Sequence, residues 1–281
     1  MIDRPRSYEE SKEFVRALKS EFEETGIITH PCASTWWKYT VCGVLRALEL
    51  LPYLEFHLDR PTTQVRVLDM GCGLGPASVA LAWRNYRHVF GLDVVMDPFG
   101  LRLAKLRAQA QGLTVHFVNG DGCRLPYASN TFDFCFCSYV VEHVATPLAF
   151  LKELQRVLVP GGILYISTNN RLWPKEPHVG LWFVNWLPPE WAGQLVAWLD
   201  RLPDQKGWNV WLLTYWQLFS MTRKAGLEIA GRYRDIFPPG SRPFSRLFHL
   251  AGLLGISMDA LAPNLHLLAR KPLGDLTNKQ W

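Results

Sequence analysis

The sequence predicts an α/β fold in which helices cover both faces of a mostly parallel β-sheet. From residue 65 onward, short apolar runs of strand length alternate with longer runs of helical spacing. The strand-length runs are apolar almost throughout, which is typical of strands buried on both faces. Alternation of this kind indicates a parallel sheet built from strand–helix–strand units.

The chain is expected to begin with helices, because Ser7 and Glu10 have capping-box spacing and apolar residues recur at helical intervals over residues 37–56. Strands are then expected over residues 65–70, 89–95, 115–118, 132–137, 163–167, 228–233 and 265–270. Intervening helices are expected over residues 76–86, 98–111, 147–158 and 215–225, with a turn at Pro160-Gly161-Gly162. Residues 1–60 are therefore expected to form an N-terminal helical extension and residues 61–281 one α/β domain.

The alternation is interrupted over residues 170–213 by a tryptophan-rich insertion. Eight of the twelve tryptophans lie between Trp173 and Trp216. They could form the core of a small subdomain, a surface for a membrane or a partner, or a lid over an apolar ligand. We favour the lid, because a segment that directly follows a parallel strand emerges at the carboxyl edge of the sheet, where ligands bind.

Composition excludes several classes of protein. The formal net charge is only +5 and no dense run of Lys or Arg occurs, so no nucleic-acid partner is expected. The six cysteines form no CxxC pair and have no accompanying histidine ladder, so neither a metal site nor a disulfide framework is expected. No apolar run approaches the roughly 20 residues of a membrane span, and the N-terminus lacks a signal core, so a cytoplasmic location is expected. The oligomeric state stays open.

A glycine-rich turn between the first strand and the next helix indicates a nucleotide-like cofactor. In the run Asp69-Met-Gly71-Cys-Gly73, the glycines let backbone approach a ligand closely, and Asp69 is placed to meet a cationic group. Position 76 carries proline where a dinucleotide fingerprint requires glycine or alanine, which disfavours an NAD-dependent oxidoreductase. Asp93 ends the second strand, where a carboxylate can accept hydrogen bonds from ribose hydroxyls.

Five segments between residues 60 and 170 together resemble the class I S-adenosylmethionine-dependent methyltransferases, most closely their small-molecule group that includes quinone- and sugar-modifying enzymes. The segments are Asp69-x-Gly71-x-Gly73, Asp93, Asn119-Gly120-Asp121 with Leu125-Pro126, Phe132 to Ser138 with Val141-Glu142-His143-Val144, and Leu154 to Gly162. The resemblance implies a Rossmann-like seven-stranded sheet whose last strand is antiparallel and lies between strands five and six. It also implies S-adenosylmethionine as cofactor, held by Asp69, Gly71, Cys72, Gly73, Asp93, Val94, Asp121, Gly122, Ser138 and His143.

Proton removal from an acceptor has two candidate bases, His143 and His178, and one possible orienting partner, Glu176. Glu142 and His143 follow the fourth strand at the ligand-binding edge, where His143 could act as a base, although in similar proteins this pair often only lines the cofactor pocket. His178 shares a proline-stiffened segment of the insertion with Glu176, which is a possible orienting partner. An exposed loop histidine of this kind is also commonly inert.

The sequence therefore predicts metal-independent O-methylation of a lipophilic small molecule such as a phenol, a quinol or a glycosylated natural product. Methylation of nitrogen or carbon stays open. The alternatives are a peripheral membrane methyltransferase that acts on a lipid and a non-catalytic module that binds the cofactor.

Overall fold

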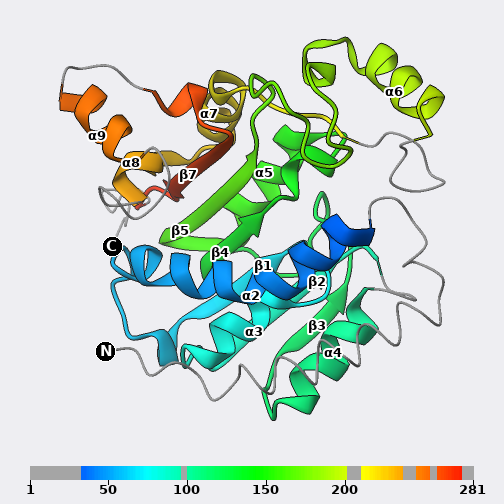
Figure 1. Cartoon of the computed structure of the whole chain (residues 1–281). Coiled ribbons are helices and arrows are strands. Elements are labelled where there is room, and N and C mark those ends of the chain that lie inside the picture. The colour runs from blue at the N-terminus through cyan, green and yellow to red at the C-terminus, as the bar shows by residue number, and fades with distance from the viewer. Residues whose placement is uncertain (1–32, 96–99, 201–209, 237–244, 254–257, 274–281) are drawn as a thin grey trace.

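The computed structural model describes residues 33–95, 100–200, 210–236, 245–253 and 258–273, which contain one seven-stranded sheet of order β3-β2-β1-β4-β5-β7-β6 (Figure 1). The strands are β1 (Arg66–Met70), β2 (His88–Asp93), β3 (His116–Asn119), β4 (Phe132–Ser138), β5 (Leu158–Asn169), β6 (Glu228–Arg232) and β7 (Asn264–Arg270). Strands β1 to β5 are parallel, and β7 is antiparallel to its neighbours β5 and β6. The expected α/β class and the antiparallel last strand between strands five and six are confirmed. The first expected helix, near Ser7, lies outside the described residues.

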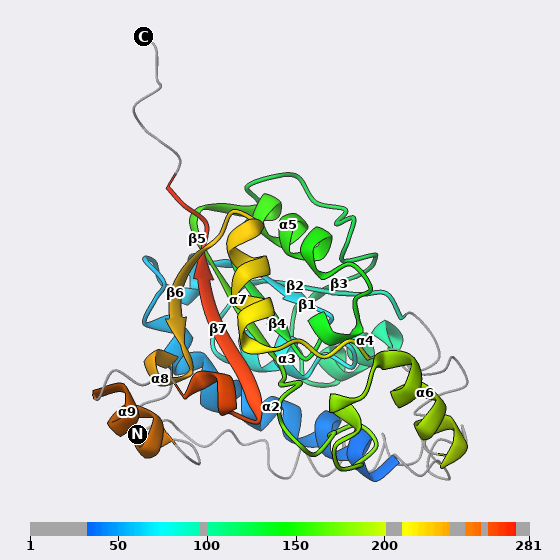
Figure 2. The ribbon, with the colours of Figure 1, turned by 90° about the horizontal axis from the view of Figure 1, so that it is seen from above.

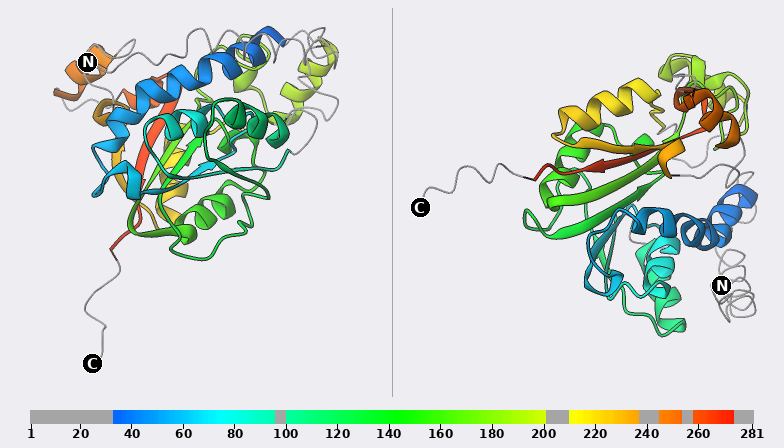
Figure 3. Two further views of the ribbon diagram at one scale, coloured as in Figure 1. Left: turned by 90° about the horizontal axis from the view of Figure 1, so that it is seen from below. Right: turned by 90° about the vertical axis from the view of Figure 1, so that its left-hand side faces the viewer.

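Helices cover both faces of this sheet (Figure 3). One face carries α2 (Ala33–Glu55), α3 (Pro76–Trp83) and α4 (Leu101–Ala110), and the other carries α5 (Pro147–Val157) and α7 (Tyr215–Lys224). Their buried side chains pack on alternate residues of the strands. On β1, Val67 contacts the core beneath α2 and α3, whereas Leu68 contacts the core beneath α5 and α7. Period-two burial on both sides explains why the strands are apolar throughout.

The element bounds differ from expectation mainly before strand five. Pro160-Gly161-Gly162 lies inside β5 rather than in a turn, so the expectation of a turn was wrong. Helix α5 does end before this proline, and the strand then starts at once. The pairing of β4 with β5 shifts register between Phe132 and Phe134, and Gly161 adopts φ +78°, so the glycines are accommodated as a bulge within the ladder.

Several short helices connect the main elements. They are η2 (Thr62–Gln64), η3 (Val141–His143), η4 (Val184–Trp186), α6 (Pro189–Trp198), α8 (Tyr233–Ile236), α9 (Ser245–Leu253) and η5 (Asp259–Leu261). Within the described residues, no helix combines the length and apolar character that crossing a membrane requires.

The tryptophan-rich insertion leaves the sheet at the carboxyl end of β5 (Figure 2). A backbone bridge between Asn170 and Leu213 closes its base. The insertion has a small apolar core of its own, made of Val179, Val184, Ala192 and Val196. None of its described tryptophans belongs to that core, and those at 182, 186, 191 and 198 are exposed. Burial of tryptophan therefore does not explain why so many cluster there.

Candidate active site

The glycine turn lies where the strand order reverses, since β1 has β2 on one side and β4 on the other. Gly71 adopts φ +69° and donates its N–H to the Leu92 carbonyl at 2.7 Å. A Cβ at this position would clash with the side chain of Val140, so only glycine fits. Gly75, at φ +73°, is the N-cap of α3. Pro76, the first residue of the helix, has no backbone N–H and so cannot donate a hydrogen bond to a phosphate there.

Asp93 ties the end of β2 to this turn. Its Oδ2 accepts the N–H of Gly73 at 2.8 Å, and its Oδ1 accepts the N–H of Val95 at 2.9 Å. The carboxylate is partly exposed, and the neighbouring Val94 side chain is exposed. Each carboxylate oxygen keeps a further lone pair, so Asp93 can stabilise the turn through these two hydrogen bonds and still accept another from a ligand hydroxyl.

Asp69 is the buried carboxyl behind the turn. Ser78 of α3 donates its hydroxyl to Asp69 Oδ2 at 2.6 Å. Burial, with a smaller contribution from the charge of Asp93, raises the pKa of Asp69 to about 7, although the hydrogen bonds from Ser78 oppose this. A cationic ligand group beside Asp69 would restore its ionised form.

This pKa predicts a dependence of stability on pH. An unfolded aspartate has a pKa of about 3.9, so the folded state keeps the Asp69 proton to higher pH, and the protein loses stability between about pH 4 and pH 7. The Asp69→Asn variant is expected to lack this loss, which in the wild type lowers the free energy of unfolding by an amount on the order of a few kcal/mol. Urea unfolding without cofactor at pH 5 and pH 8 measures it, with Asp121→Asn as the exposed control. Equal losses in wild type and Asp69→Asn would contradict the prediction.

The remaining expected cofactor contacts lie along the same edge. The carboxylate of Asp121 is exposed, and its Oδ1 accepts the N–H of Cys123 at 2.8 Å. A Cβ on Gly122 would come within 2.6 Å of the Phe150 ring, so close packing requires this glycine. The hydroxyls of Ser138 and Ser167 share a hydrogen bond of 2.8 Å at the ends of β4 and β5. The thiol of Cys72 is buried behind the turn, in the core cluster beneath α4, so only its backbone can face a ligand.

A second polar group lies just past β4, where η3 carries Glu142 and His143. Glu142 is fully buried, and His143 is exposed. The Glu142 carboxylate accepts the hydroxyl of Thr168 at 2.8 Å and the amide of Asn169 at 3.2 Å. Both donors are at the carboxyl end of β5.

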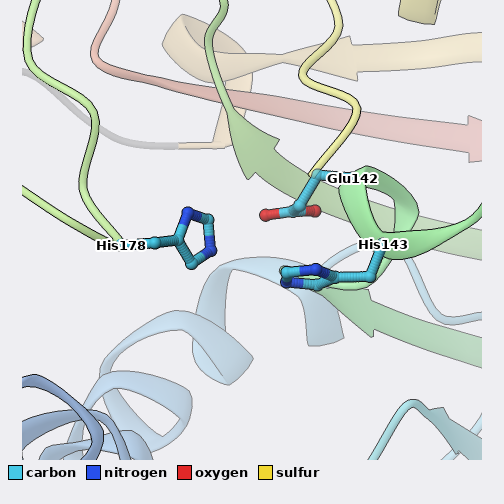
Figure 4. Close-up of side chains that lie close together, drawn as sticks. All are labelled: Glu142, His143 and His178. Atoms are coloured by element: carbon cyan, nitrogen blue, oxygen red, sulfur yellow. The ribbon is translucent and has the colours of Figure 1, made fainter. Parts of the chain in front are cut away.

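The insertion brings His178 to the same place. Residues 175–182 form a narrow hairpin with a bridge between Lys175 and Trp182. Within it, the buried Glu176 holds His178 Nδ1 at 2.5 Å through Oε1 and accepts the N–H of Val179 at 2.7 Å through Oε2. The rings of His143 and His178 stand edge to face with centroids 5.2 Å apart. Figure 4 shows the His178 imidazole pointing toward Glu142 and His143.

The charges around His178 favour its protonated form. Burial lowers the pKa of this imidazole, but the hydrogen bond to Glu176 and the charges of Glu176 and Glu142 outweigh burial and raise it above its usual value. Because a carboxylate only accepts hydrogen bonds, Nδ1 carries the proton and Nε2 keeps the lone pair in the neutral ring.

The fold brings together a possible set of metal ligands, although none was expected from the sequence. One oxygen of Glu142 and one ring nitrogen each of His143 and His178 lie within 4.8 Å of one another. A donor set of this kind can take a divalent cation as well as a proton. The sequence contains no such cluster because His178 is 35 residues beyond His143 and only the fold joins them.

His143, His178 and Glu176 were predicted from the sequence as catalytic candidates, whereas Glu142 was named only in the motif after the fourth strand, with no catalytic role, and its donors on β5 were not predicted. The position of Glu142 directly before His143, after a buried strand, was the available signal. The sequence also offers Trp36, Trp37 and Tyr39 as candidates for the wall of the acceptor site opposite the insertion. They belong to α2, but their side chains lie outside the described part of the structure.

Comparison with known proteins agrees with this geometry. A family model described as a methyltransferase domain matches residues 68–166. The ubiquinone biosynthesis O-methyltransferase of Cereibacter sphaeroides is 35% identical over 191 residues, which cover 66% of this chain and 69% of the relative. The corresponding enzyme of Dinoroseobacter shibae is 32% identical over 234 residues, covering 76% and 85% of the two chains. A solved S-adenosylmethionine-dependent methyltransferase from Mesorhizobium loti shares the fold, with a TM-score of 0.55 at 18% identity over 79% of this chain and 98% of that one.

The fold, the glycine turn and the carboxyl groups at the ends of β1 and β2 define an S-adenosylmethionine-dependent methyltransferase. The chain belongs to the class I family of these enzymes. The site fits the methyl donor, because Gly71 leaves no room for a side chain, Asp93 presents a carboxylate, and Pro76 removes a phosphate-binding N–H.

Proposed function

We propose that this enzyme methylates a hydroxyl group of a lipophilic small molecule such as a phenol, a quinol or a glycosylated natural product. The observation that carries the proposal is the imidazole of His178, which Glu176 holds at the carboxyl edge of the sheet, facing Glu142 and His143. The O-methyltransferase relatives support the same type of acceptor atom. A hydroxyl acceptor must lose its proton, and imidazole is the side chain suited to accept one near neutral pH.

In the proposed reaction the chain's own residues orient the acceptor and remove its proton. Bound S-adenosylmethionine supplies an activated methyl group. Glu176 fixes the ring of His178 so that Nε2 can accept the proton of the acceptor hydroxyl, and His143 is the second candidate for this role. Holding the acceptor oxygen in line with the methyl group can contribute about 7–11 kcal/mol to lowering the barrier.

Incubation of the full chain with methyl-labelled S-adenosylmethionine and a panel of alkyl-substituted phenols, quinols and amines tests this function. Label is expected in the methyl ethers of hydroxyl acceptors. Transfer to the amines alone would contradict it. Each assay is run after dialysis against a chelator and again with added Mg²⁺ or Zn²⁺, because proton removal by His178 requires no ion and an absolute ion requirement would contradict that step.

We also propose that the insertion over residues 170–213 forms the acceptor-binding lid. Support comes from its start at the end of β5, from the position of His178 beside Glu142, and from the exposed rings of Trp182 and Trp186, which are available to an apolar ligand. Phe183 lies between them in sequence, with its ring centroid 4.9 Å from that of Trp186. Such a lid would exclude water from the methyl group.

The lid proposal predicts that Trp182→Ala or Trp186→Ala raises the KM for the acceptor by about tenfold or more, since burying a large aromatic ring contributes roughly 1.5–3 kcal/mol. The KM for S-adenosylmethionine should change little. Trp216→Ala on α7 is the matched control, because Trp216 and Trp182 are each 61% exposed. An equal rise in both KM values, or the same effect in the control, would count against the lid.

The exposed tryptophans also favour a second candidate, a peripheral membrane enzyme that takes its acceptor from a lipid surface. Trp191 and Trp198 on α6 lie outside the small core of the insertion, and tryptophan is enriched where protein meets the membrane interface. Co-sedimentation with phosphatidylcholine vesicles, and with vesicles that include phosphatidylglycerol, tests this candidate. Loss of sedimentation in Trp191→Ala/Trp198→Ala would support it, and a wild-type protein that stays in the supernatant would exclude it.

A further inference from the structure

Phe183 of the insertion adopts a backbone conformation that a large side chain rarely takes. Its φ is +63° and its ψ is 0°, in the left-handed region. Glycine enters this region without strain, and asparagine and aspartate tolerate it better than other residues do. Within the described part of the chain, the other residues besides glycine with positive φ are Asn85, Asn130, Tyr139 and Asp200. A glycine or an asparagine at position 183 would give the same backbone at lower cost, so the backbone alone does not account for phenylalanine there.

Hydrogen bonds on both sides hold Phe183 in this conformation. Its N–H donates to the Pro174 carbonyl at 2.5 Å, and its own carbonyl accepts the N–H of Trp186 at 3.1 Å. The side-chain amide of the buried Asn185 donates to the Trp173 carbonyl at 3.0 Å. The strained residue is therefore fixed by contacts between the two segments that flank the hairpin, which is how strain persists at functional sites.

The strain does not serve the packing of the insertion. Phe183 lies outside the small apolar core of this segment and is 53% exposed. Two tryptophans beside it are exposed to a similar degree, Trp182 at 61% and Trp186 at 54%. Ring centroids are 6.1 Å apart for Trp182 and Phe183 and 4.9 Å apart for Phe183 and Trp186. The conformation of Phe183 therefore completes an aromatic surface of three adjoining rings, those of Trp182, Phe183 and Trp186.

This aromatic surface belongs to the same part of the insertion as His178. The N–H of Glu176 donates to the Leu181 carbonyl at 2.8 Å, which joins the two arms of the hairpin near its tip. The bridge between Lys175 and Trp182 follows and leads directly into the aromatic surface. His178, near the tip, points toward η3 (Figure 4). An acceptor whose hydroxyl faces His178 can therefore rest its apolar part against the arm that carries the aromatic surface.

We propose that Phe183 is a specificity-determining residue whose ring, with those of Trp182 and Trp186, selects acceptors that carry a planar aromatic ring. This inference rests on the proposed function, because it narrows the acceptor of that reaction to the phenols and quinols. Aromatic rings attract one another through their π-systems in addition to the burial of apolar area. A saturated ring of the same size buries a similar area but lacks this attraction. The surface is therefore expected to favour an aromatic ring over its saturated counterpart by roughly three- to tenfold.

The first measurement needs no methyl transfer. The full chain is saturated with S-adenosylhomocysteine, the demethylated form of the methyl donor, and titrated in a calorimeter with para-hexylphenol or with para-hexylcyclohexanol. The wild type is expected to bind the phenol roughly three- to tenfold more tightly. A wild type that binds the two compounds equally, or binds neither, overturns the proposal.

Substitutions at position 183 separate the π-system from apolar size. Phe183→Leu keeps an apolar side chain and the strained backbone but removes the aromatic ring, so the preference for the phenol should disappear. Because leucine offers a comparable apolar area, the Kd of the cyclohexanol should stay within about twofold. Phe183→Tyr keeps the ring and should keep the preference. Phe56→Leu is the matched control, because Phe56 is an exposed phenylalanine in the connection that enters β1, at the edge of the sheet opposite to the insertion.

The second measurement tests the strained backbone by unfolding in urea. Phe183→Ala and Phe183→Gly both remove the ring, but only glycine takes a positive φ without strain. Phe183→Gly is therefore expected to unfold at a higher urea concentration than Phe183→Ala, and both variants should lose the preference for the phenol. Equal midpoints, or a lower midpoint for the glycine variant, would show that position 183 carries no strain and overturn the proposal.

The binding measurements separate the remaining outcomes. A Phe183→Leu variant that keeps the wild-type preference places recognition of the ring elsewhere and overturns the proposal. An equal loss of affinity for both compounds in that variant assigns Phe183 a structural role in the lid and also overturns it. A preference that depends on Phe183, in a protein that methylates no phenol or quinol, supports the aromatic surface and refutes the proposed function instead.

Discussion

Replacing His178 with alanine is expected to lower kcat by about 10²–10⁴-fold, the usual contribution of a general base. The reason is the ring's tautomer, since Glu176 accepts the Nδ1 proton at 2.5 Å and the lone pair of the neutral ring is then on Nε2. Calorimetry should give an unchanged Kd for S-adenosylmethionine, because His178 belongs to the insertion and not to the glycine turn. Activity should also fall as the pH drops through the raised pKa of His178, since only the neutral ring accepts a proton.

Two further variants test this prediction, one at the partner of His178 and one as a control. Glu176→Gln keeps the shape of the orienting group but removes its charge, so it should lose part of the same activity. His88→Ala, at an exposed histidine on β2, should lose none. Full activity in His178→Ala, in His143→Ala and in the double variant would show that orientation alone accelerates the reaction.

Replacing Asp93 with alanine is expected to raise the Kd of S-adenosylmethionine by about 10–150-fold, which corresponds to the roughly 1.5–3 kcal/mol of a hydrogen bond to a charged group. The carboxylate accepts the N–H groups of Gly73 and Val95, so its loss frees the glycine turn and removes an acceptor for ribose hydroxyls. Titration calorimetry with the purified chain measures the effect. NAD, run in parallel, should not bind.

Asp121→Ala is the matched control for this measurement. Asp121 is also an acidic residue at the carboxyl edge, but its described contact is a local one to the N–H of Cys123. A smaller loss of affinity is expected there. An unchanged Kd in Asp93→Ala would refute the assignment of Asp93 to the cofactor site.

Most of the fold could be read from the sequence because its signals are local. The alternation of apolar strands with helical runs reflects burial of every strand on both faces, and the turn at Gly71 reflects a backbone shape and a steric limit that only glycine meets. The bulge at Gly161 escaped prediction, because proline and two glycines have the same local signature in a turn and in an irregular strand.

In the candidate site, too, the features with local sequence signals were predicted and those that depend on long-range packing were not. The sequence by itself predicted which residues gather in the proposed cofactor half, since Asp69, Gly71, Gly73 and Asp93 lie at the ends of adjacent parallel strands and such ends meet at one edge of a sheet. It also indicated that Glu176 and His178 could pair, because they are two residues apart. Only the tertiary structure decided that His178 lies close to Glu142, and that the tryptophans at 182, 186, 191 and 198 are exposed rather than packed in the core of the insertion. The position of an irregular insertion depends on long-range packing, which no periodic pattern along the chain encodes.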